Sequence, residues 1–506
     1  MRHVTTIAAV CLLLSICTSA PQAAPRDLAP IVLPKAATPG KDVQPFVKID
    51  APVVALTHVR VIDGTGAPAR ANQTLVIKNG KIAAMGNDGI AIPTDAKRID
   101  LYGHTVFPGL VGMHDHLFYI ARPNLAADPK NGQLQSDPPL IVPEMAFSAP
   151  RLYLANGVTT LRTTGSVEPY TDINLKHDID AGKLPGPHID VTGPYLEGSN
   201  SPFIQMHFLR DAEDARNTVA FWAEQGATSF KAYMNITRAE LKAAVDEAHS
   251  LGLKVTGHLC AVTYREAAEI GIDDLEHGFF VNTEHDPGKA EDTCTESDGL
   301  ATLYAMDPGG SDAKDLIKDL VVHHVAVTST LPVFEQMVLN HSPLWPQAMA
   351  TLSPQAELDY MLLREHTNAL PADQAKKRAV TFQHGMAMER EFAAAGGLLL
   401  AGPDPTGNGG VIPGFGDLRE VELLVEEGFT PEQAIRIASY NGALYLGLQD
   451  RIGSIAKGKD ADLVVVKGDP STHIDDIENV ETVFKDGTGY DTQALLKSVQ
   501  GRYGEY

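Results

Sequence analysis

Two histidines separated by one residue end an apolar stretch at residues 107–116. The side chains of His114 and His116 would point to the same side of a β-strand, because side chains alternate across a strand. Two imidazoles on one side can hold a divalent cation. A chance His-x-His pair is also expected in a chain with 18 histidines. The pair alone therefore leaves a polar strand end as the alternative.

Four more residues with metal-binding side chains lie in or after strand-like runs. They are Lys231 within 228–233, His258 after 253–256, His277 after 274–276 and Asp404 at the end of 398–404. Each residue alone has an ordinary explanation as a core histidine, a strand-edge lysine or a turn aspartate. In a (β/α)8 barrel the carboxyl ends of all strands meet on one rim. We therefore expect these four residues and the histidine pair to converge.

The segments that position these residues alternate between strand and helix patterns. Thr237 with Glu240, and Thr263 with Glu266, are typical of capping boxes at helix starts. Alternating strands and helices form parallel sheets through right-handed crossovers. Residues 108–446 are therefore predicted to form an α/β domain of the (β/α)8 barrel type.

Both ends of the chain carry further strand patterns. The short β-type runs are 53–61, 74–77, 81–85, 461–466 and 480–484. Asn79-Gly80 is typical of a hairpin turn. Residues 51–107 and 447–490 are predicted to form one small composite β-domain. Segments 282–312 and 340–380 are predicted to be long excursions on the loop face of the barrel, where loops shape the pocket.

The N-terminus has the layout of a secretory signal peptide. An apolar run at 7–17 is followed by small residues and prolines, and the run is too short for a comfortable membrane span. Residues 1–24 are therefore predicted to direct export, periplasmic or secreted, and 25–50 to form a linker or arm. The cleavage point stays open. A lipoprotein anchor at Cys17 is less favoured, because the bulky Ile16 precedes it.

Composition limits the partners. A formal net charge of −23 argues against nucleic acid and anionic membrane surfaces, because both require a positive field. No second long apolar segment is present, so no membrane span is predicted in the mature chain. Cys260 and Cys294 lie outside the predicted signal, and in an oxidising compartment they would either pair or stay free. The sequence does not decide whether the chain forms a homo-oligomer.

These residues, with their context, resemble the amidohydrolase superfamily. The resemblance rests on His-x-His followed by Lys, His, His and Asp. It also rests on 157–162 (Gly-Val-Thr-Thr-Leu-Arg), 276–278 (Glu-His-Gly) and 453–463 (Gly-Ser-Ile-Ala-Lys-Gly-Lys-Asp-Ala-Asp-Leu). It extends from about residue 53 to about residue 490 and is strongest to an exported branch related to imidazolonepropionase-like and Xaa-Pro dipeptidase-like enzymes. It implies a distorted (β/α)8 TIM barrel with a composite β-sandwich domain.

The resemblance also implies a binuclear metal centre. Lys231 would be carboxylated by CO₂, and its carbamate would bridge two divalent ions. The remaining ligands would be His114, His116 and Asp404 for one ion and His258 and His277 for the other. Imidazole and carboxylate ligands without thiolates suit Zn²⁺ best, with Mn²⁺ or Co²⁺ as alternatives. Imidazolonepropionases are mononuclear and lack this lysine, so that activity is not predicted.

The implied reaction is hydrolysis of an amide C–N bond in a peptide, an N-acyl amino acid or a related amide. A hydroxide that bridges the ions would attack the carbonyl, and Asp404 would act as base and then as acid. Tyr233 shares the strand face of Lys231 and is a candidate for binding substrate; Arg162 and His207 are weaker candidates. Alternatives are ester, lactone or carbamate hydrolysis at the same centre, and a non-catalytic scaffold.

Overall fold

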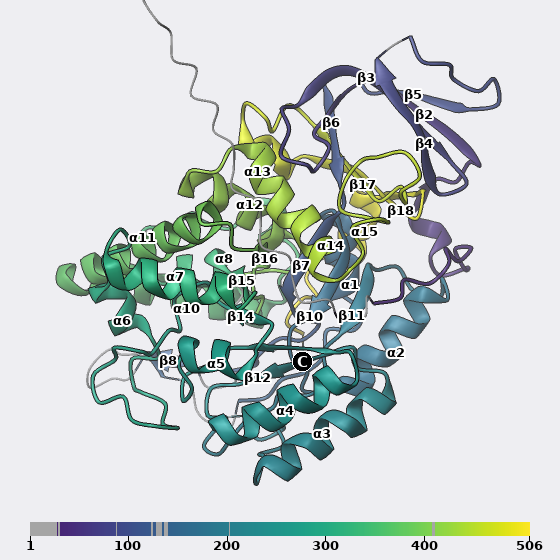
Figure 1. Ribbon diagram of the computed structural model, residues 1–506. Helices are drawn as coiled ribbons and strands as arrows, with labels where there is room; N and C mark the ends of the chain where they lie inside the picture. Colours follow the sequence, from purple (N-terminus) through teal and green to yellow (C-terminus); the bar gives the residue numbers. More distant parts are fainter. Residues whose placement is uncertain are drawn as a thin grey trace, which may run out of the picture.

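Parallel strands surrounded by helices occupy the middle of the molecule, and a larger mixed sheet lies at one end of it (Figure 1). This computed structural model describes residue 28 and residues 31–87, 89–122, 125–127, 134–135, 140–201, 203–406 and 410–505. The predicted signal peptide lies outside these residues. The chain is a mixed α/β protein with parallel sheets, as the alternating pattern predicts.

The parallel strands form two sheets, one in the order β11-β10-β7 and one in the order β12-β13-β14-β15-β16. The strands are β7 (Leu110–Asp115), β10 (Val158–Thr163), β11 (His188–Val191), β12 (Ser229–Ala232), β13 (Lys254–Gly257), β14 (Asp274–Glu276), β15 (Ala326–Ser329) and β16 (Leu399–Ala401). Their residues are buried throughout. Parallel strands have this property when both faces of the sheet are covered.

Backbone hydrogen bonds join the two parallel sheets at both edges. Gly193 N, after β11, donates to Ser229 O of β12 at 2.9 Å. Asp404 N, after β16, donates to His114 O of β7 at 3.1 Å. The carboxyl ends of β7 and β16 therefore lie side by side, although 290 positions separate these two residues in the sequence.

Most of the helices surround the parallel strands, and α15 lies beside the larger sheet (Figure 1). The helices are α1 (Ala149–Ala155), α2 (Pro169–Asp180), α3 (Ala212–Gln225), α4 (Arg238–Ser250), α5 (Tyr264–Ile270), α6 (Leu300–Ala305), α7 (Ser311–Val322), α8 (Leu331–Glu335), α9 (Pro346–Met349), α10 (Pro354–Asn368), α11 (Ala372–Ala394), α12 (Phe415–Glu427), α13 (Pro431–Arg436), α14 (Gly442–Tyr445) and α15 (Thr492–Ser498). The predicted capping boxes at Thr237 and Thr263 are confirmed. In the described residues, no helix combines the length and the apolar character needed to cross a membrane.

The segment 340–380, predicted as a loop excursion, is largely helical, since it contains α9, α10 and the start of α11. The side chain of Ser353 caps α10 and Pro354 opens it. Both residue types favour a helix start at these positions. The helix-start residues Ser353 and Pro354 therefore favour a helix here, although the residues that follow have only a weak amphipathic pattern.

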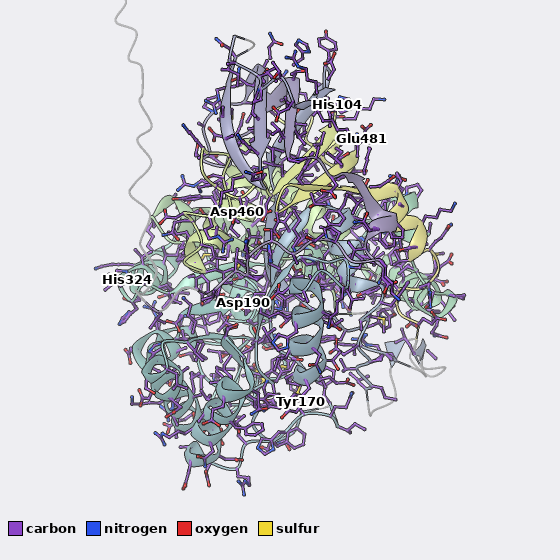
Figure 2. The ribbon with its side chains drawn as sticks, turned by 90° about the vertical axis from the view of Figure 1, so that its right-hand side faces the viewer. His104, Tyr170, Asp190, His324, Asp460 and Glu481 are labelled. Atoms are coloured by element: carbon purple, nitrogen blue, oxygen red, sulfur yellow. A yellow bond between two sulfur atoms is a disulfide. The ribbon has the colours of Figure 1, made fainter. Side chains whose placement is uncertain are left out.

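Both chain ends contribute to one nine-stranded sheet, in the order β1-β19-β18-β17-β6-β2-β3-β4 with β5 beside β2. The strands are β1 (Val47–Ile49), β2 (Val53–Val61), β3 (Arg70–Lys78), β4 (Lys81–Asn87), β5 (Lys97–Asp100), β6 (His104–Pro108), β17 (Leu463–Lys467), β18 (Val480–Lys485) and β19 (Thr488–Asp491). Figure 2 shows His104 beside Glu481, with Nε2 and Oε2 3.2 Å apart. The hairpin at Asn79-Gly80 is confirmed, with positive φ at both residues. A separate pair, β8 (Ala126–Ala127) and β9 (Leu134–Gln135), completes the strands.

Three buried glutamates on α11 and α12 make the stability of the fold depend on pH. Burial raises the pKa of Glu389 to about 8. Burial, with the charges of Glu389 and Glu420 added, raises the pKa of Glu427 to about 11. In the unfolded chain a glutamate titrates near about 4.3. Above that pH the folded state holds more protons than the unfolded state, so the free energy of unfolding falls as the pH rises.

We therefore expect the metal-free protein to unfold more easily at pH 9 than at pH 6. Glu389→Gln should flatten this dependence by up to about 1.4 kcal/mol per pH unit between about pH 5 and pH 8. Denaturant unfolding at several pH values measures the slope. The exposed Glu365 offers a matched control, Glu365→Gln. A slope equal to that of the wild type in Glu389→Gln would contradict the assignment.

Candidate metal centre

The side chains of His114, His116 and Asp404 meet at the carboxyl end of β7. Both histidine Nε2 atoms approach Asp404 Oδ1, at 3.4 Å for His114 and 3.1 Å for His116. All three side chains are buried, and their ligand atoms lie within 4.8 Å of one another. Zinc bonds of about 2.0–2.1 Å in tetrahedral geometry hold ligand atoms about 3.3 Å apart. The spacing of the three side chains therefore fits one divalent ion.

The backbone around Asp404 is shaped to place its carboxylate there. A Cβ at Gly402 would lie 2.2 Å from His114 N, so glycine is required for the close approach of β16 to β7. Asp404 has φ 57° and His277 has φ 68°. Residues other than glycine rarely adopt this left-handed conformation. Such strained residues cluster at functional sites, where the surrounding structure holds them in place.

Several buried polar atoms of the centre form no hydrogen bond with the described residues. They are Nδ1 and Nε2 of His116, Nε2 of His277 and Oδ1 of Asp404. Buried polar atoms normally have a partner. Burial lowers the pKa of His116 to about 4, so its imidazole is neutral, as a metal ligand must be. Unpartnered neutral imidazoles beside a carboxylate fit a bound cation.

Lys231, on β12, reaches the same group of side chains. Its Nζ lies 3.1 Å from His114 Nε2, and the residue is only 2% exposed. Burial lowers the pKa of Lys231 to about 8. A fraction of this amine is therefore uncharged near neutral pH.

His258 and His277 form a second pair of imidazoles. Their ring centroids lie 4.5 Å apart, and the ring of His277 lies 4.5 Å from that of His114. His277 Nδ1 is 2.9 Å from Thr330 Oγ1, which leaves Nε2 as the nitrogen for a ligand. The structure thus brings together all six residues that the sequence places at strand ends.

A carboxylate and a guanidinium beneath the centre orient His114. Its Nδ1 lies 2.6 Å from Glu276 Oε2, which turns Nε2 toward Asp404 and fixes the ring. Arg162 donates to Glu276 at 2.8 Å and to Asp274 at 2.6 Å. Sequence reasoning missed this role of Glu276. The available signal was an acidic residue in a strand that is otherwise buried.

The three residues predicted to bind substrate lie in different places. Arg162 is fully buried in the network with Asp274 and does not line the cavity. His207 is half-exposed and pairs with Asp214 at 3.0 Å, and it does not line the cavity either. Tyr233 lines the cavity, with its ring 5.2 Å from that of His258.

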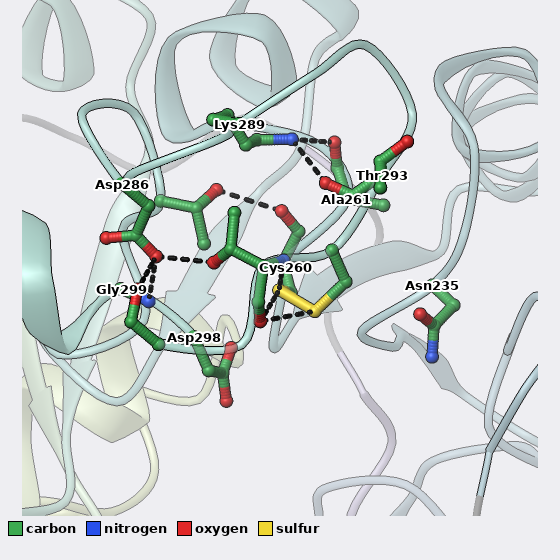
Figure 3. The surroundings of a disulfide bond; sticks show 12 residues. Asn235, Cys260, Ala261, Asp286, Lys289, Thr293, Asp298 and Gly299 are labelled. Atoms are coloured by element: carbon green, nitrogen blue, oxygen red, sulfur yellow. Dashed lines mark hydrogen bonds between the residues drawn. A yellow bond between two sulfur atoms is a disulfide. The ribbon is translucent and has the colours of Figure 1, made fainter.

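A disulfide fixes the loop next to His258. Cys260 and Cys294, left open by the sequence, are bonded with their Cα atoms 4.7 Å apart (Figure 3). Asp286 accepts from Gly299 N at 2.8 Å, and Lys289 Nζ donates to Thr293 O at 2.9 Å (Figure 3). These bonds organise the loop from within.

The same loop carries Asp298, whose Oδ2 lies 3.4 Å from His258 Nε2. The other carboxylate oxygen, Oδ1, is buried and forms no hydrogen bond with the described residues. A carboxylate that accepts from one ring nitrogen of a histidine leaves the other nitrogen to bind metal. The contact with Asp298 therefore leaves Nδ1 as the other nitrogen of the His258 ring. Sequence reasoning missed Asp298, because its neighbour His258 lies 40 positions earlier in the chain.

We expect Asp298→Asn to weaken the metal affinity of the second imidazole pair by about 10- to 100-fold. Chelator competition with metal-loaded protein measures this affinity. Reduction of the Cys260–Cys294 disulfide should also weaken metal binding at His258 and His277, because the loop that carries Asp298 is then held less firmly to β13. Asp315→Asn on the exposed side of α7 is the matched control. Equal affinities in Asp298→Asn and the wild type would contradict this orienting role.

A cavity of about 220 Å³ opens above the centre. Its floor contains His116, Lys231, His258, His277 and Asp404. Most of its side is apolar, and we call this side the apolar wall; it comprises Phe118, Ile120, Val142, Val167, Phe203 and Met206. A concave, mostly apolar surface with a few polar groups at one place is typical of a ligand-binding site.

The chain matches a protein family and several known proteins. The model of a family described as "Amidohydrolase family" matches residues 105–489. A curated relative, "Urease subunit alpha 2" of Brucella abortus (strain 2308), is 24% identical over 445 residues, which cover 81% of this chain and 65% of the relative. The chain thus spans less than two thirds of the length of that relative.

Solved structures share the fold. A putative prolidase from Bifidobacterium longum has a TM-score of 0.61 and 23% identity, covering 88% of this chain and 98% of that one. A Xaa-Pro dipeptidase with bound methionine has a TM-score of 0.63 and 22% identity, covering 87% and 100%. A bottromycin amidohydrolase has a TM-score of 0.64 and 18% identity, covering 92% and 95%.

Proposed function

Because the chain belongs to the amidohydrolase family, we propose that it is a metal-dependent enzyme that hydrolyses an amide C–N bond. The substrate would be a short peptide, an N-acyl amino acid or a related amide. The observation that carries the proposal is the convergence of His114, His116 and Asp404 beneath a cavity. The solved structures with this fold include a Xaa-Pro dipeptidase and a bottromycin amidohydrolase, whose names refer to amide bonds.

The two parallel sheets would be two arcs of one distorted (β/α)8 barrel, beside a composite β-sandwich. Hydrogen bonds at both sheet edges support this closure, since β11 joins β12 and the end of β16 joins β7. In such a barrel the carboxyl ends of the strands carry the site. The position of all six residues at strand ends agrees with that rule.

The centre would hold two divalent ions, with Zn²⁺ favoured by a ligand set of imidazoles and carboxylates. His114, His116 and Asp404 would hold one ion, and His258 and His277 the other. The carboxylated Lys231 would lie between them. Two observations support this: Lys231 Nζ lies 3.1 Å from His114 Nε2, and the rings of His114 and His277 lie 4.5 Å apart.

Bound ions would supply an activated water and polarise the substrate carbonyl. The chain itself supplies the proton acceptor, since Asp404 Oδ2 is the carboxylate oxygen turned away from His114 and His116. Asp404 would accept a proton there and return it to the leaving amine. Tyr233 would orient the substrate through its hydroxyl. The apolar wall would exclude water beyond the one that reacts.

A substrate screen with the metal content measured in parallel tests the proposal. Purified protein loaded with Zn²⁺ is incubated with dipeptides and N-acyl amino acids, and with an ester, a lactone and a carbamate of matched structure. We expect release of free amine from one or more amides, and about two ions per chain by elemental analysis. Turnover of the esters alone would replace the amide assignment. Fewer than about one ion per chain with no turnover would indicate a non-catalytic scaffold.

The protein would act after export. The apolar N-terminal run and the paired Cys260 and Cys294 support this proposal, because disulfides persist in oxidising compartments. Fractionation of cells that express the full chain tests it. Recovery of the protein in the cytoplasm at its full mass would contradict it.

A further inference from the structure

We propose that Arg122 binds a carboxylate of the substrate, and that the substrate is an N-acylated amino acid with a large apolar side chain. This inference rests on the proposed amide hydrolysis and specifies its substrate class. Its basis is the position, charge and surroundings of Arg122, a residue that the sequence pattern did not single out.

The segment after β7 points Arg122 into the cavity. His116, Phe118, Ile120 and Arg122 all line the cavity, and they are spaced by two residues. Side chains with this spacing share one side of an extended chain. Backbone pairing holds the segment, since Ala121 N donates to Ile141 O at 2.7 Å. One continuous stretch therefore joins a metal ligand, the apolar wall and a cation.

The charge of Arg122 lacks a carboxylate partner among the described residues. Its Nη1 donates to Ile120 O at 3.0 Å, and no described carboxylate forms an ion pair with it. Asp359 is the nearby acid that acts on its charge. The two oxygens of Asp359 instead accept from the Tyr119 hydroxyl and from Gln355 Nε2, each at 3.0 Å.

A half-buried guanidinium in an apolar setting is costly unless an anion pairs with it. Burial lowers the pKa of Arg122, yet arginine stays charged in proteins. Its planar fork of N–H groups matches the two oxygens of a carboxylate. Among the described residues that line the cavity, Arg122 is the one cation outside the metal centre. A carboxylate on the substrate would pair with the charge of Arg122.

The apolar wall determines the rest of the substrate. The cavity of about 220 Å³ is smaller than the range of about 300–1,000 Å³ that is usual for ligand pockets. It therefore suits one amino acid with a short acyl group. Phe118 and Phe203 in the wall favour a large apolar side chain over a charged one. The scissile amide would lie over the metal centre, with the carboxylate of the leaving amino acid on Arg122.

Binding to the metal-free protein separates this inference from the reaction. N-acetyl-L-phenylalanine and its neutral counterpart N-acetyl-L-phenylalaninamide are titrated into the wild type, Arg122→Met and Arg122→Lys by calorimetry. We expect the wild type to prefer the acid, and Arg122→Met to lower that preference by about 10- to 100-fold. Arg122→Lys should retain part of the preference. N-acetyl-L-aspartate should bind more weakly than N-acetyl-L-phenylalanine.

Arg216→Met, on the surface of α3, is the matched control and should keep the wild-type preference. Thermal unfolding of Arg122→Met checks that the variant is folded. Equal binding of acid and amide to the wild type would overturn the inference, as would an unchanged preference in Arg122→Met. If the acid binds through Arg122 but the zinc-loaded protein cleaves no amide, the proposed reaction fails while the carboxylate site stands.

Discussion

Replacement of Asp404 by asparagine is expected to lower kcat/KM for the amide substrate by about 10²- to 10⁴-fold. Asparagine keeps the shape of the side chain and one oxygen, but it cannot hold a proton at neutral pH. Burial alone would raise the pKa of Asp404, but its contacts with His114 and His116, with the nearby His277, together outweigh burial and hold that pKa well below the usual value. The wild-type side chain is therefore ionised and available as an acceptor.

Two measurements distinguish loss of proton transfer from loss of the site. The metal content of Asp404→Asn should stay mostly intact, because His114 and His116 remain and lie on a strand whose backbone is unchanged. Elemental analysis and thermal unfolding check this. Asp246→Asn, on an exposed position of α4, is the matched control. Activity of Asp404→Asn within a few-fold of the wild type would refute the assigned role.

Replacement of Lys231 by methionine is expected to abolish measurable turnover and to lower the bound metal from about two ions per chain to about one or fewer. Methionine fills the space of the lysine stem but offers no group that can be carboxylated. Lys231 is 2% exposed and lies 3.1 Å from His114 Nε2. The change therefore acts at the centre, and the surface is unaffected.

Two comparisons make the Lys231 result specific. Lys254 lies on the neighbouring strand β13 and stacks over the ring of Tyr445 at 5.3 Å, so Lys254→Met tests the cost of removing a strand lysine elsewhere. Preparation of the wild type without CO₂ should lower its activity, and bicarbonate should restore it. Two ions per chain in Lys231→Met would argue against a bridging role for this lysine.

The four strongest effects map onto separate parts of the site. The Asp404 variant tests proton transfer and the Lys231 variant tests metal content. The Asp298 variant tests metal affinity at His258 and His277, and the Arg122 variant tests substrate preference. Each variant therefore has a different readout. A variant that changed all four readouts together would indicate general unfolding.

Local patterns in the sequence anticipated a large part of this arrangement. The resemblance to amidohydrolases is confirmed by a family model that matches residues 105–489. The helix starts at Thr237 and Thr263 are present as predicted, because a capping box uses atoms only three residues apart. The hairpin at Asn79-Gly80 follows from residues that tolerate positive φ. Such features depend on neighbours in the chain.

Contacts between segments far apart in the sequence could not be predicted from local patterns. Glu276 supports His114 across 162 positions. Asp298 lies 3.4 Å from His258 on a loop that the Cys260–Cys294 disulfide joins to the segment after His258. Arg162, taken as a candidate for substrate, is instead buried against Asp274 and Glu276. Side-chain type alone could not distinguish these roles.

The six strand-end residues show which properties of the site the sequence determined and which only the tertiary structure determined. Their types and their positions after strand patterns were visible in the chain, because strand periodicity is local and parallel strands share one carboxyl edge. Their distances, the pairing of Cys260 with Cys294 and the exposure of Arg122 to the cavity came from the tertiary structure. These properties arise from packing between segments far apart in sequence. Local sequence patterns do not encode such packing, because it depends on many weak contacts that form only in the folded chain.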